Sequence, residues 1–314
     1  MNKLFIFTFL FISIQLSKAQ DSIRPQTRDT SWKTTGFFGI NAAQTSLSNW
    51  QGGGQNNVAI NGILNVNAVY KRDAFEEWTN KLDAQYGLFK PGNVPYRKNI
   101  DQLFALSKYE VLAFKKVFFY TVQADYRTQF APGYKYEGST RVGNATSDMN
   151  SPGYIQLALG LDYKPTEYFS ITVAPVAGKM TLVNRQYLAD EGAYGVQPAT
   201  YDADSNIVNH GKKVRYEFGG RVILKFKKDI FKNVNLDSYL DLFSNYTHNP
   251  QNIDVVFNNL LTFKVNKYFS ASIICQMIYD DDIIIKRVID GKVLINGPRL
   301  QALTTVGIGF GYKF

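Results

Sequence analysis

The sequence is poor in cysteine and histidine, and beyond its first twenty residues it has no long uninterrupted apolar run. The one cysteine, Cys275, excludes an internal disulfide framework, so stability must come from secondary structure and packing. One Cys and two widely spaced His, His210 and His248, also exclude a zinc site of the Cys/His type. A transmembrane helix needs about 20 apolar residues, and the chain beyond residue 20 does not supply them. We therefore expect no metal, no cofactor and no helical membrane span.

The first residues have the pattern of a secretory signal. Lys3 is followed by an apolar run from Leu4 to Leu16, and Ser17-Lys18-Ala19 places small residues at the −3 and −1 positions of a cleavage site. We expect a signal peptide at 1–19 and a short periplasmic segment at 20–33. The alternative is a buried N-terminal helix, which is rare at the start of a mature domain.

The charge and aromatic content favour an exported β protein. The net charge is +9, but the Lys and Arg are scattered along the chain, so we expect no nucleic-acid face. The chain contains 20 Tyr and 23 Phe with only 10 Pro, a composition typical of strands.

Alternation of apolar and polar residues is the dominant pattern, and it predicts strands with two unlike faces. It is clear in segments 58–70, 78–88, 118–130, 155–163, 214–226 and 300–314, and weaker in 34–45, 99–112, 168–182, 234–247, 253–265 and 268–280. Within the clear segments, every ionisable residue lies on the face opposite the apolar one. A lipid-facing Lys or Arg near the bilayer midplane costs about 2–4 kcal/mol, which accounts for this separation.

Strand length and loop rhythm distinguish a membrane barrel from a soluble sandwich, which would alternate as well. The clearly alternating segments are longer than the strands of globular sheets, which have about five or six residues. Short connectors alternate with long ones such as 131–153 and 183–212. The fold predicted for 34–314 is an all-β, transmembrane, antiparallel up-and-down β-barrel of about twelve strands. Pro175 does not suit a central strand and predicts a bulge. The register of 99–112 stays open, because both of its faces are apolar.

The chain ends on an amphipathic strand with Phe310, Tyr312 and Phe314 in phase. This terminus resembles the signal that barrel-assembly machinery reads on bacterial outer-membrane proteins. We expect an outer-membrane location in a Gram-negative bacterium, with both termini periplasmic. The expected partners are outer-membrane lipid, lipopolysaccharide, and the export and barrel-assembly machinery.

Charged residues on the polar face predict a lumen lined with both signs. The set is Lys81, Asp83, Asp125, Arg127, Arg215, Glu217, Arg221 and Lys225. Twelve tilted strands close at a backbone diameter of roughly 24 Å, which leaves about 10–12 Å between side-chain layers. The charges either pair and close the bore as a polar plug or line a narrow channel for a small solute. Mixed signs argue against strong ion selectivity.

Several short segments resemble an uncharacterised family of Bacteroidota outer-membrane proteins catalogued as domain of unknown function 3078. They are Asn41-Ala42-Ala43-Gln44, Trp50-Gln51-Gly52-Gly53-Gly54, Thr128-Gln129-Phe130, Ser151-Pro152-Gly153-Tyr154 and Gly192-Ala193-Tyr194-Gly195. The likeness extends over about 32–314. It implies a Gram-negative source of that type and an outer-membrane location, and it carries no activity or site residue.

No arrangement in the sequence predicts catalysis. A lipid-cleaving barrel would need a serine, a base and an orienting group, and only His248 near Ser244 and Asn245 offers them. Asp202-Ala203-Asp204-Ser205-Asn206 begins like a calcium loop but lacks its glycine and its final glutamate. The expected function is a narrow channel or a passive surface protein, not an enzyme. The alternatives are a secreted or periplasmic β protein that binds glycan or lipid, and a barrel enzyme acting on membrane lipid.

Overall fold

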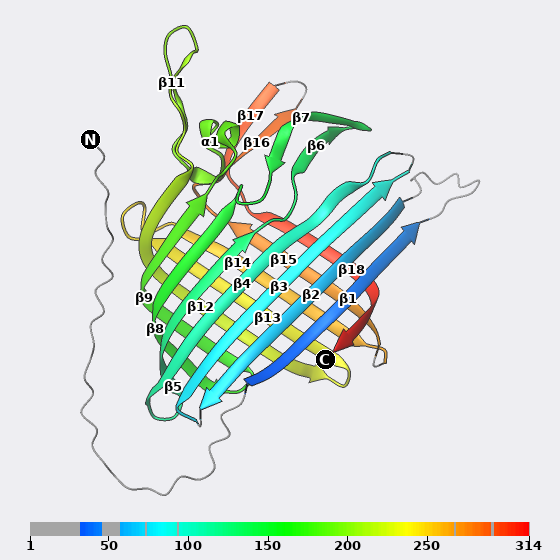
Figure 1. Cartoon of the computed structure of the whole chain (residues 1–314), viewed down its shortest axis with the longest axis vertical. Helices are drawn as coiled ribbons and strands as arrows, with labels where there is room; N and C mark the ends of the chain where they lie inside the picture. The colour runs from blue at the N-terminus through cyan, green and yellow to red at the C-terminus, as the bar shows by residue number, and fades with distance from the viewer. Residues whose placement is uncertain are drawn as a thin grey trace, which may run out of the picture.

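Twelve long antiparallel strands close into a single barrel in the computed structural model (Figure 1). The structure describes residues 32–45, 57–72, 74–92, 94–266, 268–289 and 292–313. The expected signal peptide, Trp50-Gln51-Gly52-Gly53-Gly54 and Phe314 lie outside these residues. Strands that follow one another along the chain pair around the barrel, and the first and last strands pair to close it.

The strand bounds follow the predicted segments to within a few residues. The barrel strands are β1 (Trp32–Thr45), β2 (Asn57–Arg72), β3 (Glu76–Pro91), β4 (Arg97–Phe114), β5 (Phe118–Thr128), β8 (Gly153–Thr166), β9 (Phe169–Leu182), β12 (Val214–Phe231), β13 (Val234–Asn245), β14 (Ile253–Lys264), β15 (Phe269–Tyr279) and β18 (Gln301–Lys313). The first strand begins at Trp32 and so takes in the last two residues of the segment expected at 20–33. The up-and-down barrel predicted from alternation is confirmed.

The long connections contain secondary structure of their own and gather at one end of the barrel, the upper end in Figure 1. Residues 129–152 form the hairpin β6 (Gly133–Glu137) and β7 (Thr140–Ser147), and 280–300 form β16 (Ile284–Ile289) and β17 (Lys292–Pro298). Residues 183–213 form α1 (Gln186–Asp190), η1 (Ala193–Gly195), β10 (Thr200–Tyr201) and β11 (Ile207–Asn209). Sequence periodicity did not reveal these elements, since each spans too few residues to carry a pattern.

The two faces of the strands separate as the alternation predicts. Val122 and Leu159 point outward and are 50% and 49% exposed, whereas Asp125 points inward and is 5% exposed. Such an apolar outer surface is stable only against hydrocarbon, because contiguous exposed patches of this extent are rare on soluble proteins.

Aromatic rings gather on the outer surface near the short turns. Trp32 lies 5.6 Å from Tyr70 and 5.4 Å from Trp78 between ring centroids, and Phe118 stacks on Tyr163 at 4.8 Å. Rings of this kind sit at a lipid–water interface, where one edge is apolar and the other is wet. Phe310 and Tyr312 continue this surface on β18 and are exposed outward.

The bulge predicted at Pro175 is confirmed. The register of β9 against β12 shifts between Ala174 and Ala177, and its register against β8 shifts at the same place. The bulged backbone approaches Gly160 so closely that a Cβ there would collide with the carbonyl of Val173. Glycine therefore permits the bulge by leaving room for the neighbouring backbone.

The register of β4, which the sequence left open, places Phe104 and Leu106 inside the barrel, opposite Arg127 and Asp125. Both apolar side chains are buried. The lumen is therefore partly apolar, which the alternation alone did not predict for this strand.

Among the described residues, no helix is both long and apolar enough to cross a membrane. The strand pairing, the closed ring and the apolar outer face together make the chain a transmembrane antiparallel β-barrel.

Candidate functional site in the barrel lumen

A buried arginine joins three strands about halfway along β12. Arg221 donates to Asp241 on β13 at 2.8 and 2.7 Å and to Asp125 on β5 at 2.6 Å. Strands β8 and β9 lie between β5 and β12 in the ring, so the bond to Asp125 crosses the lumen. Arg221 is 1% exposed. Planar guanidinium geometry suits two carboxylates at once, and we call these three residues the central triad.

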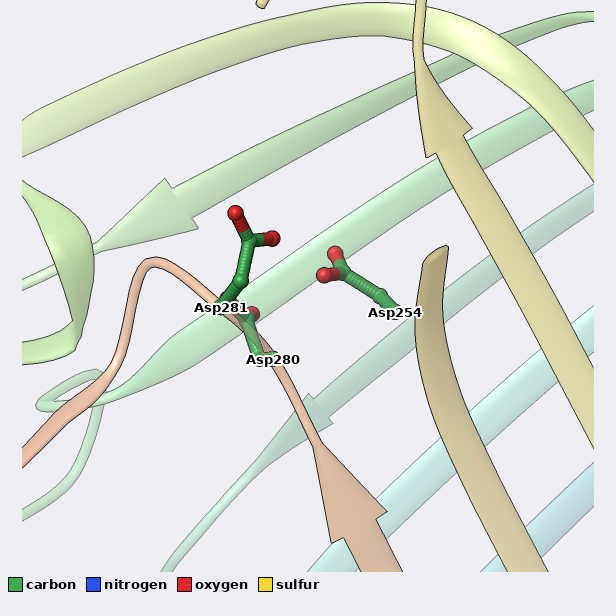
Figure 2. Close-up of side chains that lie close together, drawn as sticks. All are labelled: Asp254, Asp280 and Asp281. Carbon is green, nitrogen blue, oxygen red and sulfur yellow. The ribbon is translucent and has the colours of Figure 1, made fainter. Parts of the chain in front are cut away.

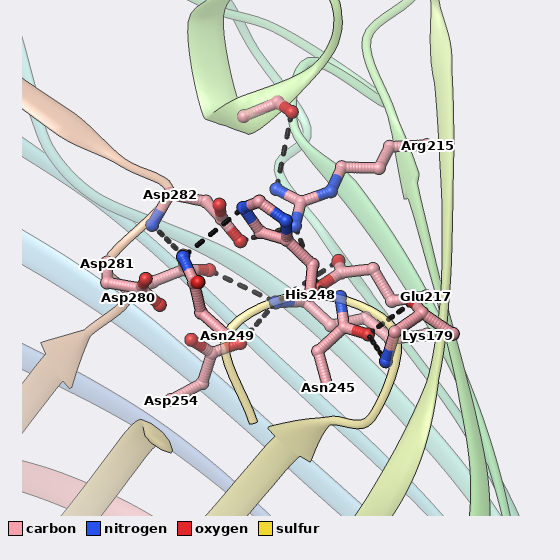
Figure 3. A network of polar contacts seen from close by, with 12 residues as sticks. Lys179, Arg215, Glu217, Asn245, His248, Asn249, Asp254, Asp280, Asp281 and Asp282 are labelled. Atoms are coloured by element: carbon pink, nitrogen blue, oxygen red, sulfur yellow. Dashed lines mark hydrogen bonds and ion pairs between the residues drawn. The ribbon is translucent and has the colours of Figure 1, made fainter. Parts of the chain in front are cut away.

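A second ionic network fills the loop end of the lumen (Figure 3). Lys179 on β9 contacts Asp254 at 2.6 Å, Asp280 at 3.0 Å and Glu217 at 3.5 Å. Glu217 also accepts from Arg215 at 3.1 Å. Because β12 and β13 lie between β9 and β14, the contact from Lys179 to Asp254 also spans non-adjacent strands.

The loops are tied to this network. Arg215 pairs with Asp282 and donates to the carbonyl of Gly195 at 3.3 Å. Arg215 thereby connects β12 both to η1 and to the segment that leads into β16.

A third cluster lies toward the short-turn end. Lys108 on β4 contacts Glu110 at 2.9 Å and Asp162 on β8 at 2.7 Å, and Lys164 contacts Glu110 at 2.6 Å. Thr172 donates to Asp162 at 2.7 Å. In this cluster and in the central triad, most of the inward charged side chains are buried and paired. They come from β4, β5, β8, β9, β12 and β13, and we call these six strands the charged half of the wall.

The remaining strands, β14, β15, β18, β1, β2 and β3, present a series of amides to the lumen among apolar side chains and the charged residues Asp254, Lys81 and Asp83, and we call them the amide half. The inward amides include Asn41, Asn61, Asn65, Asn67, Asn258 and Gln276. These side chains are half-buried, so solvent reaches them. Asn65 donates to Asp83 at 2.8 Å.

The two halves are joined across the lumen by the ion pair between Lys179 and Asp254 at 2.6 Å and by one amide pair. Gln276 on β15 donates to Gln102 on β4 at 3.3 Å, although these strands lie nearly opposite in the ring. A single neutral hydrogen bond of this length is weak compared with the ionic contacts of the central triad.

A cavity of about 370 Å³ lies in the lumen above the central triad. Asp241 and Arg127 line it, so the triad forms its floor, and Tyr194 and Ile283 line it from the loops. Tyr194 donates its hydroxyl hydrogen to the carbonyl of Thr146 in β7, and burial raises the pKa of Tyr194 to about 12. The loops therefore roof the cavity.

The structure brings together some of the predicted lumen residues and separates others. Asp125 and Arg221 share the central triad, Arg215 and Glu217 the loop-end network, and Lys81 pairs with Asp83 at 2.7 Å. Arg127 lies over the ring of Phe104 at 5.5 Å, and Lys225 lies over that of Tyr239 at 5.9 Å. Neither Arg127 nor Lys225 has an ion pair within the described residues.

Sequence reasoning missed several residues of the site. Asp241 and Asp254 fall in weakly alternating segments, where the phase did not assign a face. Lys179 follows the bulge, which reverses the phase of β9. Assigning the phase afresh after Pro175 would have placed Lys179 inside.

Three acidic residues, Asp254, Asp280 and Asp281, bring their carboxylates within 4.8 Å of one another (Figure 2). The ammonium of Lys179 already contacts two of them. This resident cation supplies the charge compensation that a metal ion would otherwise bring.

The loop features singled out in the sequence have local partners. Asp202 accepts from the backbone amides of Asp204 and Asn206 at 3.0 and 2.7 Å, which makes it a turn-stabilising residue. Ser244 donates to the carbonyl of Pro250 at 2.6 Å, whereas His248 contacts the amide of Asn249 at 3.3 Å. Ser244 and His248 are therefore not joined as a nucleophile and base.

Residues 42–134 match the family described as "Protein of unknown function (DUF3078)". The matched segment is shorter than the 32–314 over which the resemblance was expected, and it includes Thr128-Gln129-Phe130 but not Ser151-Pro152-Gly153-Tyr154. None of the curated protein sequences compared with the chain matches it.

Three solved structures are similar in fold. The COG4313 outer membrane channel from Pseudomonas putida F1 has 10% identity and a TM-score of 0.39, covering 96% of this chain and 100% of that one. The translocator domain of the autotransporter NalP from Neisseria meningitidis has 10% identity and a TM-score of 0.36, covering 91% and 89%. The copper transporter OprC has 9% identity and a TM-score of 0.22, covering 92% and 60%. At such identities and TM-scores, the function has to be argued from the geometry of this chain.

Proposed function

We propose that the chain is an outer-membrane barrel that acts as a narrow channel for small polar solutes. The observation that carries this proposal is the asymmetry of the lumen. Most inward charges of the charged half are paired and buried around Arg221, although Arg127 and Lys225 have no ion pair among the described residues. The inward amides of the amide half remain half-buried. A passage would therefore run off-centre, along β14, β15, β18, β1, β2 and β3.

The constriction supports a small conductance. The bond from Arg221 to Asp125 and the hydrogen bond from Gln276 to Gln102 both cross the lumen. Because charges of both signs are present and are mostly paired, we expect weak ion selectivity. Polar amides along the passage would replace part of the hydration of a polar solute.

The proposed location is the outer membrane of a Gram-negative bacterium, with the short turns and both chain ends on the periplasmic side. The described ends of β1 and β18 lie at the same end of the barrel as the short turns, as an even strand count requires. In bacterial barrels short turns face the periplasm and long loops face outward. A Bacteroidota-type source is the finer inference from the family resemblance.

The test is the conductance of refolded protein in planar lipid bilayers. We expect small, discrete conductance steps that increase when Gln276→Ala removes the amide contact between the walls. Val122→Ala, on the lipid-facing surface, is the matched control and should leave the steps unchanged. Bilayers that stay sealed with the wild type and with Gln276→Ala would reject the channel and favour a plugged surface protein.

Membrane integration has a separate test. We expect the protein to stay in the membrane fraction after carbonate and urea washes, because its outer face is apolar. Release without detergent would reject the barrel assignment and favour a soluble protein that binds glycan or lipid.

A further inference from the structure

Three segments far apart in the sequence converge on the loop-side cavity. Thr128, Pro152 and Tyr194 each line it, and they belong to the Thr128–Phe130, Ser151–Tyr154 and Gly192–Gly195 segments. Thr128 donates to the carbonyl of Pro152 at 3.1 Å. The segments that stood out as motifs in the sequence therefore form one wall and part of the roof of a single cavity.

Further hydrogen bonds hold these segments in place. The amide of Asn150 donates to Thr128 at 2.8 Å, and the amide of Arg185 donates to Ser151 at 3.0 Å. The loop segments that bound the cavity are thus held to β5 and to one another by hydrogen bonds, which is the arrangement that pre-organises a binding site.

Arg127 is the cation of this cavity that lacks an acidic partner. The other two basic residues that line the cavity are occupied: Lys98 contacts Asp101 at 2.9 Å, and Lys179 contacts Asp254 at 2.6 Å. Within the described part of the chain, the Arg127 side chain has no ion pair or hydrogen bond, and its Nε is buried without a partner. Arg127 as a whole is half-buried, and a partly desolvated guanidinium with free donors is stabilised by an anion, above all by a planar carboxylate.

Each acidic residue of the cavity contacts a cation, although Lys179 and Arg221 are each shared by more than one carboxylate. Asp101 pairs with Lys98, Asp254 and Asp280 pair with Lys179, and Asp241 pairs with Arg221. The surplus of carboxylates is held around Lys179 and Arg221, whereas Arg127 has no carboxylate within ion-pair distance among the described residues and can take one from a ligand.

The amides of the lining suit hydroxyl groups, and they lie among apolar side chains such as Ile100, Val256 and Leu303. Gln102, Gln156 and Gln276 present amides to the cavity, and Gln156 has no side-chain hydrogen bond among the described residues. Each amide offers both donors and an acceptor, which matches the mixed donor and acceptor character of a hydroxyl. The volume of about 370 Å³ lies at the small end of ligand pockets.

We propose that this cavity binds a small hydroxylated carboxylate of the sugar-acid class, with its carboxylate on Arg127 and its hydroxyls facing the glutamines. The inference deepens the proposed function and rests on it, since it names the class of solute held above the constriction. Binding also has a readout of its own, independent of passage through the barrel.

The experiment is isothermal titration calorimetry of the refolded full chain in detergent, with D-glucuronate, the methyl ester of D-glucuronate and D-glucose as probes. We expect D-glucuronate to bind about tenfold or more tightly than the ester, because the ester keeps the hydroxyls but loses the charge. Arg127→Gln should remove this preference. Lys227→Gln is the control, because Lys227 pairs with Asp237 at the opposite end of the barrel and does not line the cavity.

Equal binding of the acid, the ester and glucose would overturn the carboxylate assignment, and no binding of any probe would overturn the site. If Arg127→Gln does not fold, the comparison of D-glucuronate with its methyl ester on the wild-type protein still tests whether the cavity recognises the carboxylate. Conductance without binding would reject this inference and leave the channel standing. Binding to a barrel that conducts nothing would reject the channel and leave the site standing.

Discussion

The two halves of the lumen wall differ in how they accommodate polar side chains inside the barrel. The charged half, β4, β5, β8, β9, β12 and β13, buries Arg221, Asp125 and Asp241 in mutual contact across the bore. The amide half, β14, β15, β18, β1, β2 and β3, presents Asn and Gln side chains that stay half-buried. An ion needs a partner once water is removed, whereas a neutral amide can keep its water. Paired charges therefore close the side of the barrel around Arg221, and the row of amides leaves the opposite side more open to solvent.

The largest expected effect is on stability in the charged half. Arg221→Gln would leave Asp125 and Asp241 facing each other without a cation, and breaking a buried pair in this way costs about 3–5 kcal/mol. Urea unfolding in micelles should show this loss, while Asn67→Ala in the amide half, whose side chain has no hydrogen bond among the described residues, should cost less than about 1 kcal/mol. Equal losses from the two substitutions would contradict the division of the wall.

The second prediction tests whether the two halves of the wall differ only in their lumen-facing side chains and share the same kind of lipid-facing surface. Leu159→Arg on β8 and Leu82→Arg on β3 place a charge on the lipid face of the charged half and of the amide half, respectively. Each should lower the free energy of unfolding by about 2–4 kcal/mol if it sits near the bilayer midplane. Urea unfolding in lipid vesicles measures both, and a near-zero cost at either position would mean that this face does not meet hydrocarbon.

A smaller effect is expected on passage along the amide half. Asn65→Trp fills the proposed path and should lower the single-channel conductance by roughly half or more, as a bulky constriction does in a narrow pore. Ala84→Trp, at the neighbouring outward position of β3, is the matched control and should leave conductance unchanged. Equal conductance in Asn65→Trp and the wild type would show that the conducting path does not run past Asn65.

The smallest effect concerns the loop above the charged half. Asp190 accepts from Gln186 at 2.8 Å and from the amide of Gly211 at 2.7 Å, and these hydrogen bonds, the one from Gln186 foremost, lower the pKa of Asp190. A lowered pKa means that this stabilisation is present above the unfolded value of about 3.9 and is lost as the pH falls through the folded value.

Limited proteolysis of residues 183–213 should therefore accelerate below about pH 3.9 in the wild type. Asp190→Asn should loosen the loop at neutral pH and remove the acid dependence. Cleavage that rises equally with acid in both proteins would show that Asp190 does not hold the loop.

Much of the barrel could be predicted from the sequence because most of the long strands show their own alternation of apolar and polar residues. The alternation placed Val122 outside and Asp125 inside, and Pro175 marked the bulge. The alternation also placed Arg221 on the lumen side of its strand, but it did not identify the partners of Arg221. Whether Arg221 meets Asp125 depends on two strands lying between them in a closed ring, and no local pattern records that distance.

In the six clearly alternating strands, the sequence by itself determined which side chains face lipid and which face the lumen, because a strand repeats every two residues and hydrocarbon excludes charge. The tertiary structure alone decided which inward charges pair, which amides stay wet and which loop segments close over Arg127. These are contacts between residues up to 174 positions apart, as for Gln102 and Gln276, and they exist only once the ring has closed.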